Sequence, residues 1–263
     1  MTTPIPAHPS LEFDRKQARK LLTQIQAGDA AAIARLCRSH PRYRNSTTVD
    51  TGQIILADTQ LILAREYGFP SWPRWKAFVE ISALNTAQRI EQFLRAACGG
   101  SVTHAANLLR IDASFTAHDL CAAAAAGDVT SVRRLVAAGT VNLDQGPLGT
   151  TPLVYACQSR LLVTDAARRD SIVECARLLL AAGADPNRGF MRSPGDAPET
   201  VQTAIYGAAG IANHPHLTRL LIDAGARPTD SETVYHTAEF ADTTCLALIL
   251  PHAGQHDIHY CLA

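Results

Sequence analysis

The chain has 263 residues, of which 47% are hydrophobic and 6% aromatic. This composition can supply a sizeable core, and it favours helices packed through small side chains over a β-sandwich. The chain has 24 lysine and arginine residues and 24 aspartate and glutamate residues, so its formal net charge is zero. This neutrality argues against a nucleic-acid partner and against adhesion to an anionic membrane.

The N-terminal third is predicted to be helical after a short tail. Residues 1–10 are polar and proline-rich and lack the apolar run of a secretory signal, so we expect them to be disordered. Residues 11–85 contain apolar residues at helical spacing, interrupted by glycine turns at Gly28 and Gly68. Ser71 is a predicted N-cap, with Pro73 in the first turn of its helix. We expect this region to form a helical cap on the repeats that follow.

Trp72 and Trp75 allow two interpretations. They could stack on a ligand, or they could anchor the N-terminal helices on the first repeat, because the open end of a repeat stack exposes its core. The second interpretation is favoured. No apolar run reaches 18 residues anywhere in the chain, so the sequence predicts no membrane-spanning helix.

Residues 86–117 have the pattern of one helical pair, with Phe93 and Leu94 before the turn at Gly99 and Leu108 and Leu109 after it. Four later segments then end alike, in an apolar helix followed by a glycine. A glycine after a helix is typical of a position with positive φ. These segments are Arg133–Gly139, Arg177–Gly183, Arg219–Gly225 and Leu248–Gly254.

A second helical segment precedes each of these endings. The clearest begins at Thr151 and Pro152, where the threonine hydroxyl is predicted to cap the helix and proline occupies its first position. The sequence "TTPLVYACQ" here, with "LLLAAGADPN" further along, resembles the ankyrin repeat. The resemblance covers residues 118–255, about four units, and implies an all-α solenoid of stacked helix-turn-helix units with extended fingers. Residues 256–263 are similar to the start of a further, truncated unit.

Several residues depart from the family pattern. Only His236 keeps the histidine that in the family ties neighbouring fingers together; Cys121, Val154 and Tyr206 replace it elsewhere. The segment "LAREYGFPSWPRWK" further upstream is similar to one that precedes ankyrin repeats in many bacterial proteins. Two spacings exceed the family period of about 33 residues. We explain them by insertions at 159–170 and 188–202.

Few residues suggest chemistry. No nucleotide-binding, hydrolase or zinc-protease motif is found, and no cofactor or metal is predicted. The seven cysteines form no CxxC pair and are expected to be reduced and buried in a cytoplasmic protein. His214 and His216, and the group His252, His256 and His259, are interpreted as solvated turn histidines because nothing nearby completes a zinc site.

The leading functional prediction is a module that binds a partner protein through its concave groove and inserted loops. One alternative is an enzyme or small-molecule binder whose pocket between the insertions uses Tyr206, Glu199, Arg160 and Arg192. Another is a structural module of a longer protein. The predicted partner-binding residues are Pro147, Leu148, Gln158, Arg160, Arg188, Phe190, Met191, Arg192, Glu199, Tyr206 and Phe240.

Overall fold

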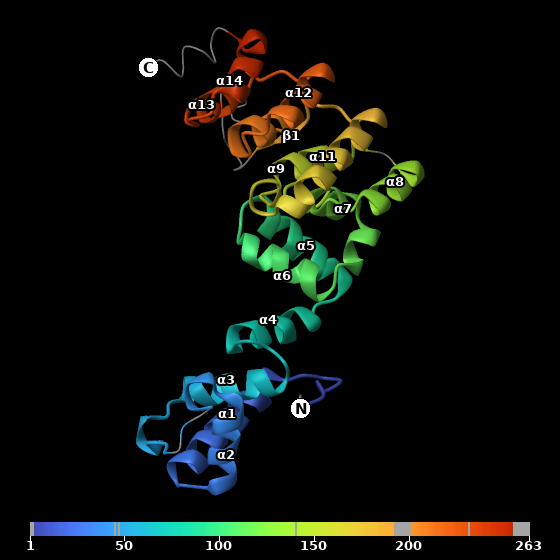
Figure 1. The fold of residues 1–263 in the computed structure, drawn as a ribbon. Helices are drawn as coiled ribbons and strands as arrows, with labels where there is room; N and C mark the ends of the chain where they lie inside the picture. Colours follow the sequence, from blue (N-terminus) through green and yellow to red (C-terminus); the bar gives the residue numbers. More distant parts are fainter. Residues whose placement is uncertain are drawn as a thin grey trace. The chain divides into compact units, whose positions relative to one another are not determined.

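The computed structural model describes residues 3–44, 46, 48–139, 141–191, 201–230 and 232–254. Its elements are almost all helical, and they fall into two compact units, residues 1–84 and 85–263. Figure 1 shows both units along the chain. None of the helices in the described ranges combines the length and the hydropathy needed to cross a lipid bilayer.

The described residues of the first unit form four α-helices and two 3-10 turns. A core of aliphatic side chains from α1, α2 and α3, including Leu21, Ile25, Leu36 and Ile62, holds these helices together. The segment before α1 is described from Thr3 onward, and the Thr3 N–H donates to the Glu66 carbonyl at 2.6 Å. The elements are α1 Leu11–Gln26, α2 Ala30–Ser39, η1 Pro41–Tyr43, η2 Thr51–Gln53, α3 Leu56–Glu66 and α4 Trp72–Ser82.

A second cluster of the first unit surrounds Trp75. Its ring is fully buried, lies stacked 4.4 Å from Tyr67 between centroids, and contacts Phe69 and Phe78. The indole Nε1–H donates to the buried Asp14 carboxylate at 2.9 Å. Trp75 therefore serves the core of its own unit and offers no face to a ligand. The helix begins at Trp72 as predicted, although Ser71 makes no side-chain cap bond.

The second unit stacks helical pairs in two layers (Figure 1). Within the inner layer α7 packs on α5 and α9, and η5 packs on α9 and α13; within the outer layer α11 packs on α8 and α12. The elements of the inner layer are α5 Thr86–Cys98, α7 Leu120–Ala126, α9 Pro152–Gln158, the π-helical η5 Tyr206–Ile211 and α13 Glu232–Ala238. Those of the outer layer are α8 Val129–Ala138, α11 Ala166–Ala181, α12 Pro215–Asp223 and α14 Thr244–Ile249, and α6 Val102–Ile111 packs on α5. The connecting elements are η3 Ser114–His118, α10 Leu161–Thr164, β1 Gly189–Phe190, β2 Gln202–Thr203 and η6 Leu250–His252.

The inner helices are short, and small residues bring them close together. All seven residues of α7 are buried, and five of them are alanine. At Gly207 a Cβ atom would lie 2.5 Å from the Cys157 carbonyl oxygen, so only glycine permits the observed approach of η5 to α9. This packing explains a core that is rich in alanine and poor in aromatic residues.

Three local predictions fail in the second unit. Gly183 and Gly225 have the expected positive φ, but Gly139 has a φ of −150° and lies in extended backbone. Thr151 precedes α9 but makes no side-chain cap bond. His236 does not join fingers; its ring nitrogens contact Glu232 and Glu239, at 3.2 and 2.7 Å.

Candidate partner-binding face

The finger before α9 is a tight turn that a single buried side chain positions. Gln145 and Thr150 form an antiparallel bridge, and Gly146 and Gly149 between them have φ of 65° and 58°. The Tyr155 hydroxyl donates to the Gln145 carbonyl at 3.0 Å and accepts the Leu148 N–H at 2.7 Å. The partner-binding candidates Pro147 and Leu148 therefore lie half-buried at a tip that the inner helix holds in place.

Two asparagine side chains bridge successive units at the base of the fingers. Asn142 donates to the Gly183 carbonyl at 2.8 Å and accepts the Asp185 N–H at 2.7 Å. Asn187 repeats the arrangement one unit later, with the Gly225 carbonyl at 3.1 Å and the Arg227 N–H at 2.9 Å. Each bridge satisfies a carbonyl and an N–H where the helix has ended, so it fixes one finger against the next.

The finger face, defined here as Leu143, Asp144, Arg188, Phe190 and Met191, joins two neighbouring fingers. Arg188 pairs with Asp144 at 2.5 Å, and its hydrogen bond to that carboxylate raises the pKa of Arg188. Phe190 is half-buried in β1, which pairs with β2 through the register Phe190 to Gln202. Leu143 and Met191 are 55% and 43% exposed, so apolar surface remains open beside the ion pair.

Two predicted groove residues are not at the surface. Gln158 is 1% exposed, and its amide donates to the Thr203 carbonyl at 3.2 Å. Tyr206 is 8% exposed, with its ring 5.7 Å from that of His236. A polar side chain in a tightly packed stack satisfies the backbone of the next unit before it can serve a partner. Neither Gln158 nor Tyr206 is therefore exposed on a groove surface, contrary to the prediction.

The other predicted site residues are dispersed. Arg160 is exposed after α9, where its backbone N–H donates to the Ala97 carbonyl at 2.8 Å, and Phe240 is half-buried after α13. Arg192 and Glu199 lie outside the described residues. The structure therefore gives no geometry for a pocket composed of Tyr206, Glu199, Arg160 and Arg192.

The insertion at 159–170 is ordered helix rather than open loop. Leu161 and Leu162 of α10 are both 1% exposed. Arg168 donates to the Ala126 carbonyl at 2.9 Å, at the C-terminal end of α7, and Arg169 donates to the Leu162 carbonyl at 2.9 Å. These arginines therefore satisfy carbonyl groups at helix ends.

Sequence reasoning missed two exposed apolar residues. Leu143 lies in the finger before Asp144, and Tyr235, 42% exposed on α13, lies edge-on to the ring of His236. The sequence does contain a signal for Leu143, because it is an apolar residue among the polar residues of the finger.

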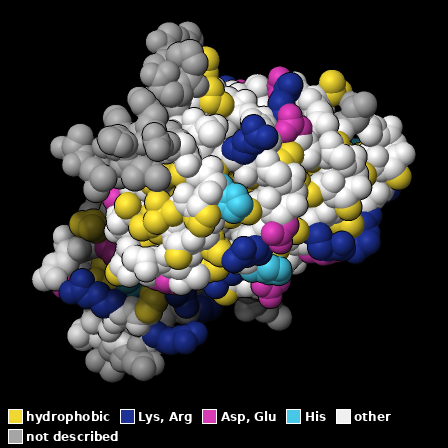
Figure 2. Space-filling view, turned by 90° about the horizontal axis from the view of Figure 1, so that it is seen from above, with side chains coloured by type: hydrophobic (Ala, Val, Ile, Leu, Met, Phe, Trp, Pro, Cys, Tyr) yellow, Lys and Arg dark blue, Asp and Glu magenta, His cyan; other side chains and the backbone are white. Residues whose placement is uncertain are grey.

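On the face seen in Figure 2, acidic and basic side chains are interspersed, and hydrophobic side chains gather in small patches between them.

Histidine and cysteine have structural roles where they are described. His214 is the N-cap of α12, with Nδ1 accepting the Leu217 N–H at 3.2 Å, and burial lowers its pKa. It is half-buried, which corrects the prediction of a solvated turn histidine. The six cysteines of the described ranges are free thiols, and burial raises the pKa of Cys98 to about 12. Within those ranges no three metal-ligating side chains gather, and His256 and His259 lie outside them.

One comparison with known proteins matches part of the chain to the family that the repeat pattern resembles. Residues 148–189 match the family described as Ankyrin repeat. The chain is also 30% identical over 150 residues to inversin from Gallus gallus, a match that covers 55% of this chain and 12% of inversin. No solved structure matches the chain. The predicted fold class, an all-α stack of ankyrin-like helical units, is confirmed.

Proposed function

We propose that the second unit binds a partner protein, and that the finger face is the centre of the contact. The observation that carries this proposal is the pair of exposed apolar side chains, Leu143 and Met191, on neighbouring fingers that Asn142 bridges and that the Asp144–Arg188 ion pair also connects. Ankyrin repeats are generally protein-interaction modules, and residues 148–189 match that family. We further propose a cytoplasmic location, since the described cysteines are free thiols.

The rigidity of the fingers supports this function. Asn142 and Asn187 bridge successive units, and Tyr155 fixes the finger tip. A surface that is already ordered loses little conformational entropy on association, so a larger part of the contact energy is retained as affinity. Interfaces of stable complexes bury about 1,600 Å² and concentrate their energy in a few anchor residues. Leu143 and Met191 are the proposed anchors.

Affinity capture from a native cell extract tests the proposal. The wild-type chain is compared with a variant carrying Leu143→Ser and Met191→Ser, and with Val163→Ser as the matched control. Val163 is 49% exposed on α10, outside the finger face. We expect a protein that the wild type and the control retain and the double variant loses. Equal capture by all three chains would contradict the proposed contact.

Direct binding of the captured protein follows. Truncation of a central interface residue typically weakens binding by about 1–4 kcal/mol, so we expect roughly tenfold or greater loss of affinity for the double variant. A partner lost equally from Val163→Ser would place the contact elsewhere on the molecule.

A further inference from the structure

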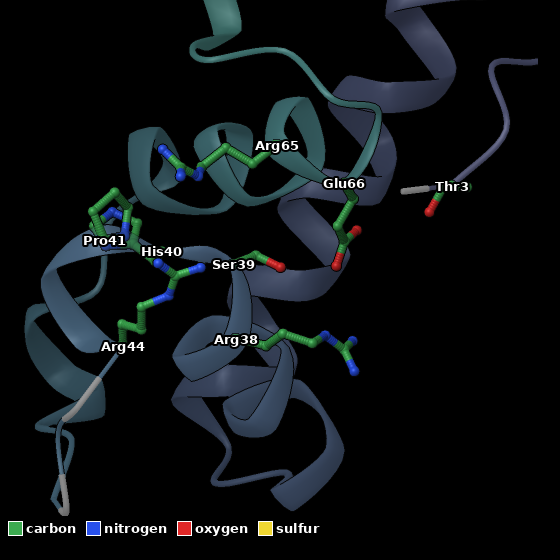
Figure 3. Close-up of a pocket in the computed structure, with 8 residues that line it drawn as sticks. All are labelled: Thr3, Arg38, Ser39, His40, Pro41, Arg44, Arg65 and Glu66. Carbon is green, nitrogen blue, oxygen red and sulfur yellow. The ribbon is translucent and has the colours of Figure 1, made fainter. Parts of the chain in front are cut away.

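The first unit contains an open pocket of about 650 Å³ that the sequence analysis did not find (Figure 3). This volume lies within the range of about 300–1,000 Å³ that small-molecule sites commonly occupy. Three arginines line it, Arg38, Arg44 and Arg65, together with Ser39 and Glu66. The sequence signal was the basic segment around residues 38–44, to which the fold adds Arg65 from another helix.

Three elements of the first unit build the pocket. Arg38 and Ser39 come from the end of α2, Arg44 follows η1, and Arg65 and Glu66 come from the end of α3. The turn between α2 and η1 is fixed by His40, which is 7% exposed. Its Nδ1 accepts the Arg42 N–H at 3.2 Å, and its Nε2 lies 3.2 Å from the Asp58 carboxylate. The wall beside the arginines is therefore preformed.

The electrostatics of the pocket favour an anion. Glu66 is already paired with Arg35 through two hydrogen bonds, of 3.1 and 2.8 Å. Arg38, Arg44 and Arg65 are exposed, and across the part of the chain that the structure describes none of them lies within ion-pair distance of a carboxylate. Three positive charges thus line one concave surface, and its one acidic side chain is already neutralised.

The orientation of the guanidinium groups indicates where charge would bind. In Figure 3, Arg44 and Arg65 both extend toward the side of the pocket formed by His40 and Pro41, whereas Arg38 extends toward the side of Glu66. Guanidinium groups recognise phosphate through parallel N–H donors, with a geometry that lysine cannot supply. Two arginines on one side and a third on the other suit a ligand with two charged groups.

We propose that this pocket binds a small phosphorylated molecule of the diphosphate class. One phosphate is held by Arg44 and Arg65, and the second group is held by Arg38, with the Ser39 hydroxyl available as a further donor. The limited volume and the zero net charge of the chain favour a small ligand over a nucleic acid, which needs an extended basic surface. This site is independent of the finger face, which belongs to the other unit.

Isothermal titration calorimetry of the full chain with inorganic pyrophosphate tests the proposal, at low and at moderate salt. The variants are Arg44→Gln and Arg65→Gln, with Arg19→Gln as the control. Arg19 is an exposed arginine of α1 that does not line the pocket, so the control makes the same change in charge. Circular dichroism verifies that each variant is folded. We expect pyrophosphate to bind the wild type and the control equally, and each pocket variant to bind at least tenfold more weakly.

Three results would overturn the assignment, and a fourth, on orthophosphate, would contradict its two-sided geometry. One is the absence of pyrophosphate binding at millimolar concentration and low salt. Another is an equal loss of affinity in Arg19→Gln, which would show general attraction of anions to the surface. The third is tighter binding of a phosphoserine peptide or of single-stranded RNA than of pyrophosphate, which would assign the arginines to a macromolecular partner. Orthophosphate should bind more weakly than pyrophosphate, since it can reach only one side of the pocket, and equal affinities would contradict the two-sided arrangement.

Discussion

The close approach of η5 to α9 at Gly207 gives the sharpest test of the fold. In Gly207→Ala the new Cβ would lie 2.5 Å from the Cys157 carbonyl oxygen, 2.6 Å from its carbon and 2.9 Å from the Gln158 nitrogen, where ordinary contacts are 3.4 to 4 Å. All three atoms are backbone, so no change of rotamer relieves the clash and the two inner helices must separate. Overpacking typically costs about 1–3 kcal/mol, and this site belongs at the upper end of that range.

A loss of about 3 kcal/mol corresponds to a fall in Tm of roughly 6–12 °C for a chain of this size. Thermal unfolding followed by circular dichroism measures it. Gly139→Ala is the control, because Gly139 lies in extended backbone and, among the described residues, its Cβ would meet only the Leu135 carbonyl oxygen, at 3.6 Å. We expect the control to be neutral or slightly stabilised. A Tm for Gly207→Ala within about 2 °C of the control would refute the contact between the inner helices, by the same scaling.

Three further predictions follow from single contacts. Trp75→Phe leaves the buried Asp14 carboxylate without its indole donor, so the free energy of unfolding, measured by urea denaturation, should fall by about 1–3 kcal/mol. A fall of less than about 0.5 kcal/mol would contradict a stabilising role of that hydrogen bond. Asn187→Ala should increase the hydrogen-exchange rate of the Arg227 amide and lower the free energy of unfolding by about 1 kcal/mol. An unchanged exchange rate would show that Asn187 does not protect this amide. Burial lowers the pKa of His214, so the folded chain favours the neutral form of this side chain. The stability that His214 contributes is therefore complete above the unfolded pKa of about 6.5 and is lost as the pH falls below it. Wild-type stability should therefore decrease as the pH falls below about 6.5, and it should decrease less in His214→Asn, which retains a capping side chain; equal decreases would exclude His214 as the titrating group.

Local patterns in the sequence were sufficient for the helices and their pairing. Apolar residues at helical spacing, proline at the first position of α9 and glycine after α11 and α12 each act within one turn of helix, so their effects can be predicted without the fold. The ankyrin-like arrangement followed because these short-range signals recur along residues 118–255.

The roles of polar side chains depended on the tertiary structure. Gln158 and Tyr206 have the residue types of a binding surface, but the next unit covers them, and a buried polar group satisfies whichever backbone group lies nearest. The sequence alone determined an all-α stack of helical pairs, because periodicity and helix ends are local. Only the tertiary structure decided which charges stay free. It places Arg38, Arg44 and Arg65 around one pocket and pairs Glu66 with Arg35, because such neighbours are set by packing between helices that are distant in sequence.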